Sequence, residues 1–198
     1  MIKKSERALA SRQTLVQSAR RLFEAKGYAA TSTEELLAQT GLTRGALYHH
    51  FRDKKALFDA VCDAAHGELV RTIDVATDGV GDPRVALREG AHAWMRAVAD
   101  PRLARLLLIE APAVLGPQAW SAADARHGYA SLRQGVEEAM GSGSRTAAEL
   151  DAVAVALNGA MNELARWVAA DATRLDEALA ALDAALAGFQ TPGARPAG

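Results

Sequence analysis

Cysteine, aromatic residues and long apolar runs are all scarce in this sequence. One of its 198 residues is a cysteine, Cys62, and 5% are aromatic, so no disulfide can form within the chain and a reducing compartment suits it. No apolar run approaches the roughly 18 residues that a membrane-spanning helix needs. The N-terminal stretch MIKKSERALASRQ lacks the apolar core of a signal peptide. We therefore expect a soluble, cytoplasmic protein with no membrane partner.

Lysine is absent beyond Lys55, and positive charge is concentrated before it. Residues 1–55 hold 11 Lys and Arg against 5 Asp and Glu, whereas residues 56–198 hold 12 Arg against 19 Asp and Glu. The net charge of −1 therefore hides a basic head and an acidic body. This asymmetry favours a polyanion partner for the head, with chance segregation of surface charge as the alternative.

Helical periodicity and abundant alanine predict an all-α fold, and no segment has the alternation of a strand. DGVGDP at 78–83 and GSGS at 141–144 interrupt the pattern, and the tail, residues 191–198, is expected to be disordered. Breaks are also expected at Pro112 and at Gly116–Pro117. The first helix is expected to end near Gly27. The later helices are expected over 33–40, 44–50, 54–77, 84–99, 118–140, 146–170 and 174–188.

The stretch TSTEELLAQTGLTRGALYHHFRDKKALF carries dense helix-start and helix-stop signals. Ser32 and Glu35 are spaced for a capping box, and Gly41 suits the left-handed residue that ends a helix. Thr43 and Asp53 are placed to cap the next two helices. The result is a helix, a turn of about three residues and a short second helix, which is the helix-turn-helix arrangement.

Two helices of this stretch begin with cations: Arg44 opens one, and Lys54 with Lys55 opens the next. Cations at a helix N-terminus are unfavourable unless a negative partner lies nearby. DNA supplies such a partner, because a helix in the major groove brings its N-terminal residues to phosphates and base edges. Arg44 could donate two hydrogen bonds to a guanine, while Leu47 and Phe51, four residues apart, would face the core. Ordinary solvated side chains are the alternative.

This stretch resembles the DNA-binding domain of the TetR family of bacterial transcriptional regulators. The resemblance covers about Arg12 to Val61, roughly a quarter of the chain, and includes the spacing G-x-x-x-G-x-L-Y-x-H-F-x-x-K from Gly41 to Lys54. Leu37 departs from the family's common Ile-Ala pair. The other matching residues are Leu22, Phe23, Gly27, Tyr28, Thr31, Ser32 and Leu57.

The resemblance implies an N-terminal three-helix DNA-binding domain over residues 1–60, with the motif at about 32–51, and a helical ligand-binding and dimerisation domain over 61–190. It implies a double-stranded DNA operator as the partner. The residues that would hold phosphates are Thr33, Tyr48, His50 and Lys54. Those that would face the groove are Thr43, Arg44, Gly45, Ala46 and His49.

A homodimer would bind two half-sites about 34–36 Å apart, and the last two helices fit its interface. Helix 146–170 carries one stripe of small residues and another of larger apolar residues, so it should have neighbours on two sides. The alternative is that both stripes lie in the core of one chain. The predicted interface residues are Ala152, Ala156, Gly159, Glu163 and Trp167.

The resemblance also implies a pocket for a small-molecule effector, whose binding would shift the spacing of two heads. Asn158 and Asn162 stand four apart on one face of an apolar helix, where amides need hydrogen-bond partners. Ordinary core or surface is the alternative for each candidate. The candidate lining residues are His92, Trp94, Met95, Glu110, Trp120, Tyr129, Asn158 and Asn162.

No motif points to catalysis or to a metal. The histidines of the body are far apart in sequence, Cys62 has no second cysteine, and there is no glycine-rich phosphate loop or nucleophile elbow. No cofactor is therefore expected. We expect a ligand-responsive repressor that leaves an inverted-repeat operator on binding its effector. The alternatives are an activator, a ligand-free architectural DNA binder, and a helical enzyme or metal sensor.

Overall fold

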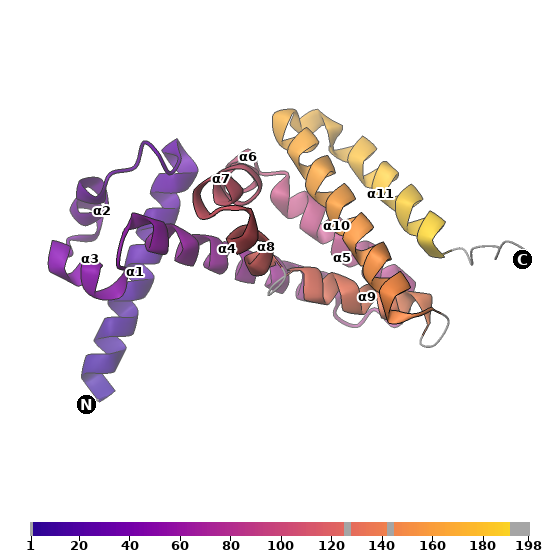
Figure 1. Cartoon of the computed structure of the whole chain (residues 1–198), viewed down its shortest axis with the longest axis horizontal. Coiled ribbons are helices and arrows are strands. Elements are labelled where there is room, and N and C mark those ends of the chain that lie inside the picture. Colours follow the sequence, from indigo (N-terminus) through magenta and orange to yellow (C-terminus); the bar gives the residue numbers. More distant parts are fainter. Residues whose placement is uncertain (1, 125–127, 142–144, 191–198) are drawn as a thin grey trace, which may run out of the picture. The chain divides into compact units, whose positions relative to one another are not determined.

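The chain is described by a computed structural model over residues 2–124, 128–141 and 145–190 (Figure 1). Every regular element within those ranges is a helix, which confirms the all-α prediction there. None of these helices is both long enough and apolar enough to cross a membrane. The predicted disordered tail and most of the GSGS joint lie outside the described residues.

The chain divides into two compact units. The first takes in residues up to Gly67 together with Arg105–Ala123, and the second takes in Glu68–Ala104 and the residues from Asp124 onward. The helix α4 (Lys54–Thr77) therefore contributes to both. The division at residue 60 that the family resemblance implies stays a prediction.

The first unit holds the predicted three-helix head. Its elements are α1 (Ile2–Lys26), α2 (Thr33–Thr40), α3 (Arg44–His50), the start of α4, η1 (Arg105–Glu110), α7 (Ala111–Leu115) and α8 (Pro117–Asp124). The rings of Phe23 and Phe58 meet edge to face with centroids 5.2 Å apart, and Tyr28 lies 4.9 Å from Phe58. These three rings join α1, the turn after it and α4 in one core.

Local capping sets the limits of α2 as predicted. The Ser32 hydroxyl accepts a hydrogen bond from the Glu35 N–H at 3.2 Å, and the Glu35 carboxylate accepts one from the Ser32 N–H at 2.9 Å. Gly41 ends the helix with φ of 65°, a conformation that glycine adopts without steric cost. Because these signals act within a few residues, the predicted bounds of 33–40 are confirmed.

The break expected at Pro112 is wrong. The chain stays helical from Pro101 to Leu115, and the six residues of η1 that precede α7 form a π-helix. Proline has no N–H to donate and its ring crowds the carbonyl four residues earlier. The wider π turn before it accommodates this defect, so the chain remains helical into α7.

In the first unit, η1 packs against the end of α1. The Arg105 guanidinium donates to the carbonyls of Phe23 and Glu24 at 2.9 and 2.7 Å. The Phe23 carbonyl also accepts the Gly27 N–H at 2.8 Å, so Arg105 adds a second donor there and a donor for Glu24 in the last turn of α1. The Glu110 carboxylate accepts from the Tyr28 N–H at 2.9 Å. Gly27 allows this approach, because a Cβ there would lie 2.4 Å from a Glu110 oxygen.

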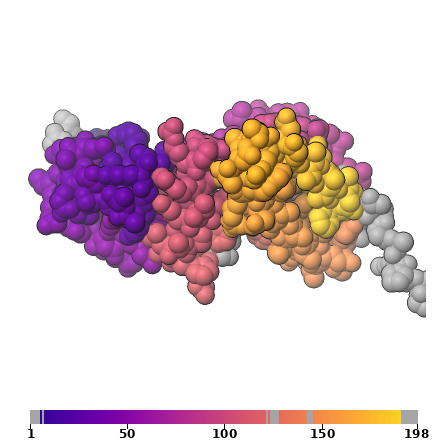
Figure 2. All heavy atoms as spheres, turned by 90° about the horizontal axis from the view of Figure 1, so that it is seen from above, coloured from indigo at the N-terminus to yellow at the C-terminus, as the bar shows by residue number. Residues whose placement is uncertain are grey.

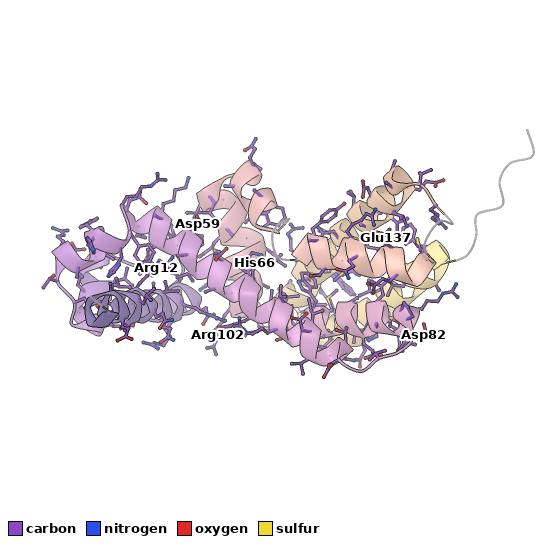
Figure 3. The ribbon with its side chains drawn as sticks, turned by 90° about the horizontal axis from the view of Figure 1, so that it is seen from below. Arg12, Asp59, His66, Asp82, Arg102 and Glu137 are labelled. Atoms are coloured by element: carbon purple, nitrogen blue, oxygen red, sulfur yellow. The ribbon has the colours of Figure 1, made fainter. Side chains whose placement is uncertain are left out.

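The second unit is a helical bundle. It contains the rest of α4, α5 (Pro83–Val98), α6 (Pro101–Ala104), α9 (Ala130–Met140), α10 (Ala147–Ala170), η3 (Ala172–Arg174) and α11 (Leu175–Gln190). Asp82, labelled in Figure 3, caps α5 by accepting from the Arg84 N–H at 2.8 Å. Met95, Val136 and Leu182 are fully buried in its core. α10 and α11 pack side by side and reach the surface (Figure 2).

Candidate functional site

The short helix α3 presents its polar side to solvent because its apolar side is anchored. Leu47 and Phe51 are 3% and 5% exposed, which confirms the prediction that they face the core. Arg44, Tyr48 and His49 are exposed. Tyr48, 45% exposed, shares this face with a guanidinium and an imidazole, so the face is a candidate contact surface.

The start of α3 is shaped by a cap and by small residues. The Thr43 hydroxyl accepts from the Ala46 N–H at 3.2 Å, which confirms the predicted cap. A Cβ added at Gly45 would meet only the Thr43 hydroxyl, at 3.9 Å. Because Gly45 and Ala46 carry little or no side chain, another molecule could approach the backbone of the first turn of α3 closely.

Arg44 has a negative partner that sequence reasoning missed. Its guanidinium donates to Glu34 Oε1, 2.8 Å away on α2, and both side chains are more than 60% exposed. The Thr33 hydroxyl donates to the other Glu34 oxygen at 3.1 Å. Hydrogen bonds from its own backbone amide and from Thr33, with the charge of Arg44, hold the pKa of Glu34 below its usual value. The two residues lie ten apart in the sequence on separate helices, so no local signal indicates this pair.

Lys54 begins α4 beside the same surface. Asp53 caps this helix by accepting from the Ala56 N–H at 2.7 Å, as predicted. The Lys54 ammonium lies 4.1 Å from the centroid of the Tyr28 ring, a cation–π contact. Burial lowers the pKa of Lys54, and the charge of Glu110 opposes that shift.

The two remaining predicted contact residues also lie at this surface. His50 is partly buried, and its ring centroid lies 5.3 Å from that of His49. Thr33 is the first residue of α2. The helix starts at Thr33, Arg44 and Lys54 together offer backbone N–H groups, hydroxyls and two cations, a set suited to phosphate.

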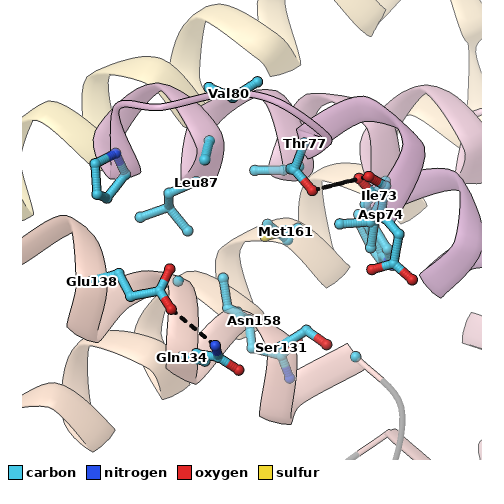
Figure 4. Close-up of a pocket in the computed structure, with 18 residues that line it drawn as sticks. Ile73, Asp74, Thr77, Val80, Leu87, Ser131, Gln134, Glu138, Asn158 and Met161 are labelled. Carbon is cyan, nitrogen blue, oxygen red and sulfur yellow. Dashed lines mark hydrogen bonds between the residues drawn. The ribbon is translucent and has the colours of Figure 1, made fainter.

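The second unit contains a cavity of about 360 Å³ (Figure 4). Residues of α4, α5, α9 and α10 line it, together with Val80 in the turn before α5. Its volume falls within the range of roughly 300–1,000 Å³ that is typical of small-molecule sites. Trp94 and Asn158, two of the eight predicted ligand residues, line this cavity.

The other predicted ligand residues of the second unit lie apart from the cavity lining. His92 is buried, and its Nε2 lies 2.7 Å from Asp183 Oδ1. Met95 and Asn162 are buried in the bundle. The Tyr129 hydroxyl donates to the Asp151 carbonyl at 3.5 Å.

Glu110 and Trp120 belong to the first unit, where each has a structural partner. Glu110 binds the Tyr28 N–H, and the Trp120 indole N–H donates to the Leu107 carbonyl at 2.8 Å. Among the described residues, no group of three or more His, Cys, Asp and Glu is arranged to hold a metal ion.

The predicted interface residues occupy one exposed face of α10. Ala152, Ala156, Gly159 and Glu163 are all exposed, whereas the larger apolar residues Val153 and Leu157 are buried. Nothing lies within 4 Å of a Cβ built at Gly159. Trp167 is 42% exposed, with the Arg174 guanidinium 5.1 Å from its ring centroid.

Two family descriptions match the chain. Residues 15–61 match "Bacterial regulatory proteins, tetR family", and residues 85–189 match "Tetracyclin repressor-like, C-terminal domain". The first match contains α2, α3 and the start of α4, and the second contains α10 and most of α11.

Three known proteins show how far the similarity extends. The HTH-type transcriptional regulator AcrR of Shigella flexneri is 37% identical over 112 residues, which are 54% of this chain and 50% of AcrR. The chain thus matches about half the length of this relative.

Solved structures resemble a larger share of the chain. A TetR-family transcriptional regulator from Pectobacterium atrosepticum is 32% identical with a TM-score of 0.76, covering 93% of this chain and 96% of that one. RolR in complex with resorcinol is 17% identical with a TM-score of 0.70, and the match covers 98% of this chain and 100% of RolR. At this identity the likeness shows a common fold and nothing more. The matches over 15–61 and 85–189 and the Pectobacterium structure show that this chain belongs to the TetR family of bacterial regulatory proteins.

Proposed function

We propose that this protein is a cytoplasmic, sequence-specific repressor that binds an inverted-repeat operator as a homodimer and leaves it when a small molecule binds the second unit. The observation that carries the proposal is the exposed face of α3, where Arg44, Tyr48 and His49 project from a helix anchored by Leu47 and Phe51. Placed in a major groove, this face would reach base edges while the starts of α2 and α4 meet phosphates.

Charge supports a nucleic acid partner for the head. Residues 1–55 carry an excess of cations, and the rest of the chain carries an excess of anions. The basic surface would draw the head to DNA, and the acidic remainder would not compete for it. Arg44 would exchange Glu34 for a guanine edge, and Lys54 would meet a phosphate.

The exposed face of α10 supports the homodimer. A row of alanines and Gly159 leaves a low surface that another helix could approach closely, and Val155 on the same helix is 61% exposed. α11 lies beside α10 and exposes small residues as well, among them Ala184 and Gly188. Two helices from each protomer would bury this apolar area.

The cavity of the second unit supports a small-molecule effector. RolR, which has the same fold, was solved with resorcinol bound, and the second unit of this chain has a cavity of about 360 Å³. An effector that prefers one arrangement of the protein shifts the population toward it by its differential affinity. We propose that effector binding favours an arrangement in which two heads no longer fit two half-sites.

The first test is selection of genomic fragments by the purified protein, followed by sequencing. A palindromic site that overlaps a promoter supports the repressor, and a site upstream of the promoter favours an activator. Binding without sequence preference would indicate an architectural DNA binder. If no fragment is enriched at low salt, the proposal fails, and bound metal or catalytic turnover becomes the property to measure.

A further inference from the structure

We propose that the cavity of the second unit takes an organic cation with an apolar body. This inference rests on the proposed function in one respect, since it treats the cavity as the effector site. It adds the charge and chemical class of the effector, which neither the fold nor the family matches specify.

Charge among the residues that line the cavity has one sign. Asp74 of α4 and Glu138 of α9 both contribute carboxylates, and the described lining residues include no Lys, Arg or His. In Figure 4 the two acids lie on opposite sides of the cavity, with apolar residues such as Leu87 and Met161 between them. An anion would meet two like charges there and no cationic side chain among the described lining residues, whereas a cation would be attracted from both sides.

The local hydrogen bonds leave these carboxylates able to accept. Glu138 Oε1 receives the amide N–H of Gln134 at 2.9 Å on the same helix, which orients the carboxylate without neutralising its charge. The carboxylate of Asp74 has no hydrogen bond or ion pair with any described residue, whereas the Thr77 hydroxyl is occupied by the carbonyl of Ile73 at 3.0 Å. The charges of both acids therefore remain available to a cationic group.

The rest of the lining suits the body of such a ligand. Trp94 supplies an aromatic face, which attracts cations as well as apolar rings. Ile73, Leu87 and Met161 supply apolar surface, and Asn158 and Ser131 add neutral polar groups. A volume of about 360 Å³ is near the lower end of the range for small-molecule sites, so the ligand is compact.

The test uses three probes with one carbon skeleton and different charge: 4-phenylbutylamine, 4-phenylbutanol and 4-phenylbutyrate. Each is titrated calorimetrically into the full-length protein and into Asp74→Asn, Glu138→Gln and the double variant. Glu137→Gln is the matched control, because Glu137 precedes Glu138 on α9 but pairs with Arg133 at 3.0 Å and does not line the cavity. Circular dichroism checks that every variant keeps its helices.

We expect the amine to bind roughly 10- to 100-fold more tightly than the acid, with the alcohol between them, and each single substitution to cost the amine roughly three- to tenfold. The double variant should lose the preference, and Glu137→Gln should keep it. Equal or tighter binding of the acid, no binding of the amine, or an amine preference that survives the double substitution would overturn the inference.

Operator binding is measured separately on the same preparations without probe. A protein that binds its selected operator but shows no amine preference contradicts the cation inference and leaves the repressor proposal standing. A protein that prefers the amine but binds no DNA contradicts the repressor proposal alone.

Discussion

Arg44 at the start of α3 is held by Glu34 at the start of α2, with 2.8 Å between the guanidinium and the carboxylate. In the free protein, this carboxylate relieves the cost of a cation at a helix N-terminus. It also holds the guanidinium on the side of α3 that faces solvent. DNA binding would therefore exchange the carboxylate partner of Arg44 for a guanine edge.

Arg44→Ala should weaken operator binding and relax base preference. Loss of a bidentate contact to guanine should cost about 1–3 kcal/mol of discrimination at one position in each half-site. Titration of operators with each base at every position measures this. Arg52→Ala is the control, because Arg52 is also strongly exposed and pairs with Asp53. Unchanged discrimination in the Arg44 variant would exclude α3 as the reading helix.

Glu34→Gln should strengthen DNA binding at every sequence. The substitution removes a negative charge near the phosphates and frees Arg44 from an ion pair, while the amide can still accept the Thr33 hydroxyl hydrogen bond. The gain should shrink as salt rises, because salt screens exposed charges. Fluorescence anisotropy at two salt concentrations measures it. Weaker binding by the Gln variant would mean that Glu34 positions Arg44 on the DNA.

Lys54→Ala should lower affinity for all sequences to the same extent. Each head would lose one phosphate contact, so the slope of log affinity against log salt should fall by about 0.9 per head. Loss of the cation–π contact with Tyr28 should lower stability by about 0.5–1 kcal/mol. Lys54→Arg keeps the charge and should retain most of the binding. A salt slope unchanged in the Ala variant would place Lys54 away from the backbone.

Glu35→Gln should remove part of the acid sensitivity of folding. Hydrogen bonds from Lys26 and from the Ser32 backbone lower the pKa of Glu35 from 4.5 to about 2. The Glu35 carboxylate binds a proton more tightly in the unfolded chain than in the folded one. Its contribution to the free energy of unfolding is therefore present above pH 4.5 and is lost as pH falls toward 2. Thermal unfolding between these pH values should therefore change less in Glu35→Gln than in the wild type. Parallel curves for the two proteins would contradict this linkage.

Val155→Glu should disrupt the homodimer and weaken operator binding together. Val155 is 61% exposed on the proposed interface face of α10, and a buried unpaired charge there would oppose association. Val75→Glu is the matched control, because Val75 is 79% exposed on α4. Analytical ultracentrifugation should show a dimer in the wild type and in the control. A dimeric Val155 variant would exclude this face.

The limits of the head helices could be predicted because their signals are local. The capping box at Ser32, the left-handed Gly41 and the caps at Thr43 and Asp53 each act over two or three residues. The spacing of Leu47 and Phe51 likewise indicated which side of α3 is buried. Sequence reasoning therefore identified the candidate DNA-reading face with its exposed residues.

The second unit could be predicted only in outline. Alanine-rich periodicity indicated its helices, but which side chains share a cavity depends on how four helices pack. Glu110 and Trp120 are predicted from the sequence as ligand-lining residues. In the structure their hydrogen-bond partners are Tyr28 and Leu107, and all four residues belong to the first unit. Nothing in the sequence distinguishes Asp74 and Glu138 from other acidic residues, which are common at exposed helix positions.

By itself, the sequence determined the helical class, the limits of α2, α3 and α4, and the face that α3 exposes, because capping and periodicity act within a few residues. Only the tertiary structure decided the pairing of Arg44 with Glu34, the continuous helical path through Pro112 and the acidic lining of the cavity. The Arg44–Glu34 pair and the cavity lining depend on groups that the chain brings together from separate helices, which no local signal encodes. The path through Pro112 depends on the π turn that precedes it, which helical periodicity does not indicate.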